Sequence, residues 1–149
     1  MSIRGSFSAL AFCIVGALSA SVPAATEVAS LMEKGQQQLD AGELEQALLT
    51  FQQVVVEDPT SSVGYTRLGG VRLLRQEYRA GVESFQRAIT LDQQNAEAFV
   101  GMALAYLHLG QYQLARESLK QAQLLDPAKT EEIERVMAWI DQRSTASTH

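Results

Sequence analysis

The chain of 149 residues has few of the side chains that build disulfide, metal and phosphate sites. Its one cysteine, Cys13, cannot form a disulfide within the chain, so stability has to come from packing. Histidine occurs only as His108 and His149, and the familiar metal-binding spacings are missing. Gly69 and Gly70 are adjacent, but they are not part of a Gly-rich phosphate-binding loop. These absences predict a protein that is not an enzyme and uses no cofactor or metal.

The charge balance is acidic. The chain carries 12 Lys and Arg residues against 17 Asp and Glu residues, a formal net charge of −5. Such a surface repels phosphate backbones, so we expect no nucleic-acid partner. With 149 residues, of which 46% are hydrophobic, the chain is long enough for one domain with a sizeable core.

Residues 1–25 have the pattern of a secretory signal peptide. Arg4 precedes an apolar run, Phe7–Leu18, and small residues suited to cleavage follow. The run is shorter than the roughly 20 residues that span a bilayer. We therefore expect a mature chain that begins between Ser21 and Glu27.

Two alternatives to this cleavage stay open. The segment could be retained as a membrane anchor, or Cys13 could be a lipidated cysteine, although bulky Phe12 stands where a small residue is expected. Cleavage would leave no cysteine, and the loss of Arg4 would reduce the 12 basic residues to 11. We expect a periplasmic or secreted protein that has no membrane segment after cleavage.

A pattern recurs every 34 residues in the rest of the chain. The stretch "GELEQALLTFQQVVVEDP" at 42–59 is followed by "QEYRAGVESFQRAITLDQ" at 76–93 and "GQYQLARESLKQAQLLDP" at 110–127. The small and apolar residues persist, whereas Glu45 becomes Arg79 and then Gln113. Conserved packing with variable polar residues indicates a unit of construction rather than a catalytic site.

Each unit has the spacing of two amphipathic helices. In the second half of the first unit, one such stripe consists of Leu44, Ala47, Leu48, Phe51, Val54 and Val55. Asp58 and Asp126 precede prolines and are expected to end helices. No segment alternates well enough to be a strand.

These residues resemble the tetratricopeptide repeat family, whose repeat has this length. The resemblance implies an all-α, right-handed α-solenoid of three helix-turn-helix units, Val28–Ser61, Ser62–Asn95 and Ala96–Lys129. Small residues at Gly35, Gly69 and Ala103 match the family's close helix contacts. Lys34, Gln38 and Arg72 depart from the pattern and suggest looser packing early in the array, and Gln93 stands where the family closes a unit with proline.

After the third unit, one more helix is expected from Thr130 to about Arg143, and a flexible tail at 144–149. Its apolar face, formed by Ile133, Val136, Met137 and Ile140, would cover the open edge of the last unit. Trp139 lies beside this face and would be either partly buried or a partner contact.

The resemblance implies protein or peptide binding on the concave surface formed by the first helix of each unit. The candidate groove residues are Met32, Gln36, Leu39, Thr66, Arg67, Gly70, Leu73, Leu74, Val100, Leu104, Leu107 and His108. A clamp for a terminal carboxylate is disfavoured, since only Arg67 could contribute. Gly70 would be either a notch in the groove or a tolerated helix glycine.

Two functions follow from this interpretation. The first is a scaffold or assembly factor of the bacterial cell envelope that holds another exported protein. The second is a self-association module that forms a homo-oligomer. The identity of the partner cannot be inferred from the residues.

Overall fold

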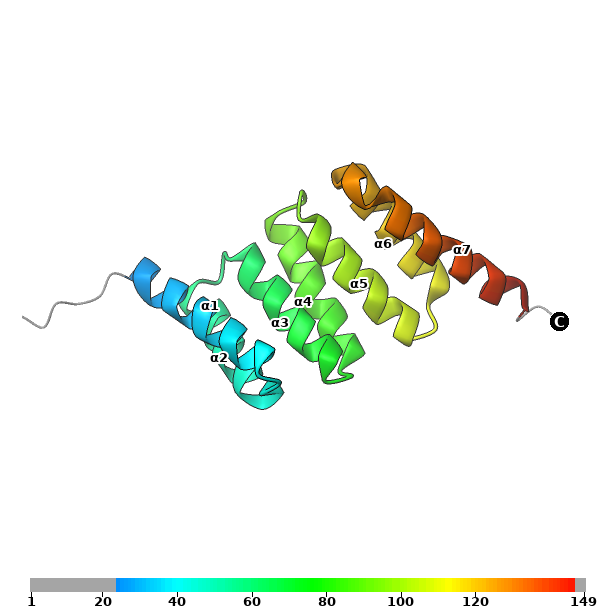
Figure 1. The fold of residues 1–149 in the computed structure, drawn as a ribbon. Helices are drawn as coiled ribbons and strands as arrows, with labels where there is room; N and C mark the ends of the chain where they lie inside the picture. The colour runs from blue at the N-terminus through cyan, green and yellow to red at the C-terminus, as the bar shows by residue number, and fades with distance from the viewer. Residues whose placement is uncertain (1–23, 147–149) are drawn as a thin grey trace, which may run out of the picture.

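The computed structural model describes residues 24–146 (Figure 1). The expected signal peptide, with Cys13 and Arg4, lies outside the described residues except for Ala24 and Ala25. The last three residues, 147–149, lie outside them as well.

The described chain is built from helices that stack one after another, and it contains no strand (Figure 1). They are α1 (Ala24–Asp40), α2 (Leu44–Glu57), α3 (Ser62–Leu74), α4 (Tyr78–Leu91), α5 (Ala96–His108), α6 (Tyr112–Leu125), the 3-10 turn η1 (Pro127–Lys129) and α7 (Thr130–Ala146). The predicted all-α solenoid is therefore confirmed.

One helix end differs from that expected. Helix α7 continues to Ala146, three residues beyond the predicted end at about Arg143. The three residues after Arg143 include no proline or glycine, so nothing in their backbone chemistry ends the helix there.

The two helices of each unit are joined by the same tight turn. Gly42, Gln76 and Gly110 adopt left-handed backbone angles, with φ of 76°, 63° and 71°. At the first turn, the N–H of Glu43 donates to the carbonyl of Gln38, which satisfies an otherwise unpaired group at the end of α1. Gln76 adopts this conformation without being glycine, so the turn follows the repeat register rather than the residue type.

Consecutive units are joined by an aspartate turn. The carboxylate oxygens of Asp58, Asp92 and Asp126 each accept a hydrogen bond from the backbone N–H two residues ahead, over 2.9–3.2 Å. The aspartate side chain therefore makes the turn at all three places. Since proline is not needed for this bond, Gln93 can replace it.

The core consists of three hydrophobic clusters in chain order. In the first, Phe51 packs on Gly35; in the second, the Phe85 ring lies between Gly69 and Gly101. The third unit uses Ala103 with a leucine instead of a phenylalanine. Each cluster includes residues of the next element, so the units are stabilised by their neighbours, as expected for a solenoid.

Helix α7 covers the end of the array. Ile133 and Ile140 are 3% and 1% exposed and join the third cluster, which Val136 and Met137 also contact. Trp139 stays 41% exposed, with its ring edge-on to Tyr112 at a centroid distance of 6.4 Å. Within residues 24–146, no helix has the length and apolar character needed to cross a membrane.

Candidate functional site

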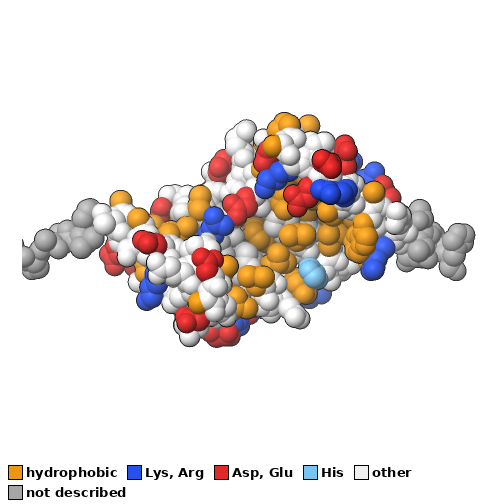
Figure 2. All heavy atoms as spheres, in the orientation of Figure 1, with side chains coloured by type: hydrophobic (Ala, Val, Ile, Leu, Met, Phe, Trp, Pro, Cys, Tyr) orange, Lys and Arg blue, Asp and Glu red, His pale blue; other side chains and the backbone are white. Residues whose placement is uncertain are grey.

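A groove of about 330 Å³ runs along the first helices of the units. Helix α3 packs directly on α5 but makes few contacts with α1, which leaves the groove between them. Nine of the twelve predicted residues line it: Gln36, Leu39, Thr66, Arg67, Gly70, Leu73, Leu74, Val100 and Leu104. Figure 2 shows the hydrophobic band across this face over α3 and α5, between charged surfaces over α1 and α7.

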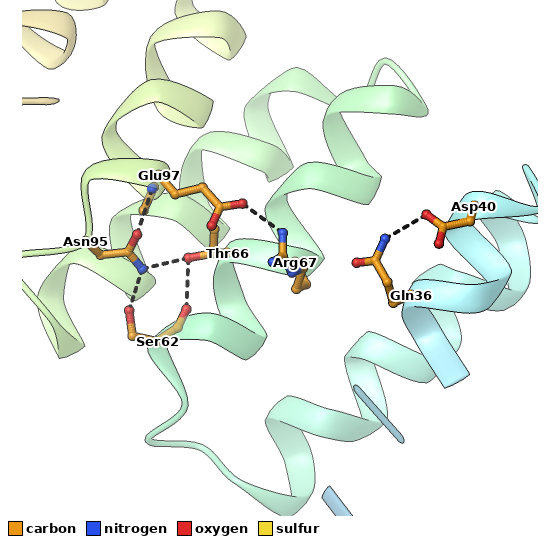
Figure 3. Close-up of polar contacts among 8 residues, drawn as sticks. Gln36, Asp40, Ser62, Thr66, Arg67, Asn95 and Glu97 are labelled. Atoms are coloured by element: carbon orange, nitrogen blue, oxygen red, sulfur yellow. Dashed lines mark hydrogen bonds and ion pairs between the residues drawn. The ribbon is translucent and has the colours of Figure 1, made fainter. Parts of the chain in front are cut away.

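One end of the groove is polar. An ion pair joins Nη1 of Arg67 on α3 to Oε1 of Glu97 on α5 over 2.8 Å. On α1, the amide of Gln36 donates to Asp40 over 2.8 Å. Figure 3 shows Arg67 between Glu97 and Gln36. Because Glu97 already neutralises Arg67, this end carries no free positive charge for a carboxylate.

Thr66 lies in the wall of the groove but is engaged in a structural network. Its hydroxyl donates to the carbonyl of Ser62 over 3.0 Å and accepts from Nδ2 of Asn95 over 2.9 Å. Asn95 also donates to the Ser62 hydroxyl over 2.8 Å and accepts from the N–H of Ala98 over 2.9 Å, which caps α5 (Figure 3). The Thr66 side chain therefore ties α3 to α5 and is not available to a ligand.

The other end of the groove is apolar. Leu73 and Leu74 near the end of α3 face Leu104 on α5 and Leu39 on α1. Gly70 lies between the polar and apolar ends, and a Cβ atom built on it would meet nothing within 4 Å. Gly70 is thus not required for helix packing, and its missing side chain widens the groove.

Three predicted residues do not line the groove. Met32 packs into the first hydrophobic cluster, and Leu107 packs against the third. His108 is exposed at the end of α5 and stacks on Tyr78, with ring centroids 4.4 Å apart and an interplanar angle of 1°. These residues share the repeat register of the groove, but they do not line it.

Three lining residues were not predicted: Phe85, Glu97 and Gly101. Gly101 could have been found, because it is the equivalent of Arg67 one repeat later. Phe85 belongs to the second helix of its unit, and its ring reaches the groove wall because Gly69 and Gly101 let it approach α3 and α5 closely. Glu97 is identified by its ion pair with Arg67, which the sequence does not reveal.

No group of three or more His, Cys, Asp or Glu side chains that could hold a metal ion occurs within the described part of the chain. The groove presents an apolar surface, the ion pair between Arg67 and Glu97, and an open notch at Gly70.

Comparison with known proteins shows what this arrangement is similar to. A family model described as "Tetratricopeptide repeat" matches residues 72–140. The human PEX5-related protein is 26% identical over 88 residues, which cover 59% of this chain and 14% of that protein. The chain thus spans less than a fifth of the length of the curated relatives it matches.

Solved structures share the fold. The first TPR of Spaghetti (RPAP3), bound to the HSP90 peptide SRMEEVD, superimposes with a TM-score of 0.77 at 18% identity, over 80% of this chain and 94% of that one. The Yersinia enterocolitica type III secretion chaperone SycD, in complex with a peptide of the translocator YopD, gives a TM-score of 0.75 at 22% identity, over 80% and 95%. The family model thus matches residues 72–140, and the likeness to these structures shows that the described chain has the tetratricopeptide repeat fold.

Proposed function

We propose that this protein is a non-enzymatic scaffold or assembly factor that holds a segment of another protein in the groove. The observation that carries the proposal is the open apolar surface along α3 and α5, where Leu74 and Leu104 remain 56% and 39% exposed. Contiguous exposed apolar side chains in a helical groove are typical of sites that bury an amphipathic helix or an extended apolar segment.

The chemistry of the groove favours an apolar or amphipathic partner. Two neighbours of the same fold hold peptides, and the one from HSP90 has the acidic sequence SRMEEVD. Here Arg67 is paired with Glu97, so a clamp for a terminal carboxylate has little support. A partner would gain affinity by covering Leu73, Leu74 and Leu104.

We further propose that the partner is another exported protein and that binding takes place in the bacterial cell envelope. The supporting observation is the signal-peptide pattern of residues 1–25.

Site-specific photocrosslinking in the native cells tests the groove. A photoreactive amino acid at Leu104 is expected to capture the partner, whereas the same amino acid at Leu124 is the control. Leu124 is 74% exposed on α6 and does not line the groove. A protein captured from position 104 alone is then purified and titrated against variants of Gly70.

Filling the notch at Gly70 is expected to weaken binding of this partner. We expect Gly70→Leu to reduce affinity at least about tenfold, or roughly 1.4 kcal/mol, while Gly70→Ala has a smaller effect. Circular dichroism verifies that both variants are folded. Equal affinities for the wild type and Gly70→Leu would contradict the groove as the binding site. Capture of a second copy of this chain, with a mass that rises with concentration, would establish self-association instead.

A further inference from the structure

A second cleft lies on the other side of α3, between α2 and α4. Its volume is about 550 Å³, and it shares no residue with the groove. The residues that line this α2–α4 cleft are Gln52, Val55, Val56, Tyr65, Leu68, Arg72, Glu83, Ser84 and Arg87. It contains one of the charged departures from the family pattern, Arg72.

Arg72 is held at one end of its guanidinium group. Its Nη1 donates to the carbonyl of Ala80 over 3.1 Å and to the hydroxyl of Ser84 over 2.7 Å. Its Nε and Nη2 donate to none of the described residues, and no buried side-chain nitrogen or oxygen among these residues lacks a partner. The remaining N–H groups of Arg72 therefore face solvent in the cleft, at a fixed position and with no carboxylate neutralising them.

Arg87 adds a second positive charge. Its Cζ lies 5.8 Å from the centre of the Tyr65 ring, a cation–π contact that holds the side chain over α3. Within the described residues, it forms no ion pair. Glu83 lines the same cleft, so two guanidinium groups and one carboxylate leave a single net positive charge. This balance suits one carboxylate better than a polyphosphate chain.

The wall opposite these charges is formed by α2, with Gln52 and two valines. Val55 and Val56 on α2 line the cleft, and Val56 is 71% exposed. A large exposed valine beside two arginines forms an amphipathic surface, which can hold an apolar side chain next to an acidic one.

The repeat provides an internal comparison. One unit later, Arg72 is replaced by Tyr106 and Arg87 by Gln121. Tyr106 packs against the third hydrophobic cluster, and its hydroxyl accepts from Gln86 at 3.5 Å. The later junction of the same fold is thus stabilised with neutral side chains. The fold can therefore be packed at these two positions without arginine.

We propose that the α2–α4 cleft is a second interaction surface, which binds a segment of a partner protein that carries a carboxylate beside an apolar side chain. The carboxylate accepts hydrogen bonds from Nε and Nη2 of Arg72 and lies close to Arg87. The neighbouring apolar side chain packs on Val55 and Val56. Because this surface shares no residue with the groove, the protein can hold two segments at once.

A pair of synthetic peptides tests the chemistry. The probe is a short acetylated and amidated peptide with one Glu flanked by Leu and Ser residues, and its control has Gln in place of Glu. Both are titrated into the isotope-labelled full chain, and amide chemical shifts are followed. The Glu peptide is expected to shift the signals of Val55, Val56 and Arg72, and the Gln peptide to bind about tenfold more weakly, because the charge-assisted hydrogen bonds are lost.

Substitutions that copy the equivalent residues of the next repeat test which arginines bind the peptide. Arg87→Gln and Arg72→Tyr introduce the side chains of the next unit and are each expected to reduce affinity for the Glu peptide about tenfold. The matched control is Arg79→Gln, which removes the same charge from an exposed position of α4 outside the cleft and introduces the residue found at Gln113. It is expected to leave the affinity unchanged.

Several results would overturn the proposal. These are equal affinities for the Glu and Gln peptides, an equal loss in all three variants, and shifts confined to the groove residues Gly70 and Leu104. An absence of shifts at the highest soluble peptide concentration would overturn it too. Arg87 is exposed, so Arg87→Gln remains informative even where Arg72→Tyr fails to fold. Gly70→Leu changes the groove and leaves the α2–α4 cleft intact. The proposal for the groove and the proposal for the cleft can therefore be refuted separately.

Discussion

Single glycines set how closely the helices of this protein approach. A Cβ atom on Gly69 would lie 2.7 Å from the Phe85 ring, and one on Gly101 would lie 2.4 Å from it. Both distances are shorter than a carbon–carbon contact permits. Phe85 is 2% exposed, so its ring has little space to move away. The α3–α5 contact therefore depends on two glycines and one phenylalanine.

Substitution by alanine should change stability in opposite directions at Gly70 on α3 and at Gly101 on α5. Gly70→Ala is expected to raise the free energy of unfolding by up to about 1 kcal/mol, because it adds helix propensity in open space. Gly101→Ala gains the same propensity but displaces Phe85, and overpacking costs about 1 to 3 kcal/mol. We expect a net loss of stability for Gly101→Ala. Denaturant unfolding of both variants measures the difference, and an equal gain for both would show that the Phe85 ring yields freely.

The start of α5 carries a network of polar side chains that joins it to α3. Asn95 caps the helix through its oxygen and bonds Ser62 and Thr66 of α3 through its nitrogen. All of these partners are half-buried or buried. Loss of this side chain would leave polar groups unpaired in the core.

Two substitutions at this position separate its two roles. Asn95→Ala removes the cap and the inter-helix bonds, and it is expected to lower the free energy of unfolding by about 2 kcal/mol or more. Asn95→Asp keeps an acceptor for the cap but loses the Nδ2 donors, so we expect an intermediate loss. Denaturant unfolding with unchanged slope gives both values. If Asn95→Asp matched the wild type, the bonds to α3 would contribute nothing.

The capping helix α7 protects the last unit. Ile133 and Ile140 bury their side chains in the third cluster, together with Leu119 of α6. Removing residues 130–149 is expected to expose this cluster. A solenoid with an uncovered apolar edge is less stable and tends to associate.

Truncation therefore has two measurable consequences. The variant that ends at Lys129 should unfold at a lower temperature, and its mass in solution should rise with protein concentration. A chain that lacks only residues 147–149 is the control, because it retains all of α7. A stable monomer after the longer truncation would mean that α7 covers no important surface.

Taken together, the stacked units give the molecule two separate surfaces. The groove lies along α1, α3 and α5, whereas the α2–α4 cleft lies on the opposite side of α3. Both cross the junction between the first and second units, where α1 makes few contacts with α3. Lys34, Gln38 and Arg72 predict looser packing early in the array, and both surfaces lie in that part of the molecule.

Export is tested on the complete precursor. We expect the protein purified from its native cells to begin between Ser21 and Glu27, because residues 1–25 have the order of a signal peptide. N-terminal sequencing of the extracytoplasmic fraction measures this. Replacing residues of the apolar run Phe7–Leu18 by polar ones is the control and should keep the protein in the cytoplasm. Recovery of the wild-type protein with residues 1–18 attached would rule out cleavage.

Helix number, repeat register and cap position were predictable from the residues alone. Apolar periodicity is a local property, and a 34-residue repeat transfers one unit's pattern to the next. The same register predicted most residues of the groove wall. The same register also contains Gly101, which stands one repeat after Arg67.

Contacts between units could not be predicted in this way. The repeat register predicts Met32, Leu107 and His108 in the groove. In the structure, Met32 and Leu107 pack against hydrophobic clusters, and His108 stacks on Tyr78. The neutralisation of Arg67 and the exposure of Arg72 depend on the residues that neighbouring helices present. The repeat determines which residues lie on each face of a helix. Which of these residues contact one another depends on how the helices are placed in the tertiary structure, because close packing brings each side chain against residues distant in the chain.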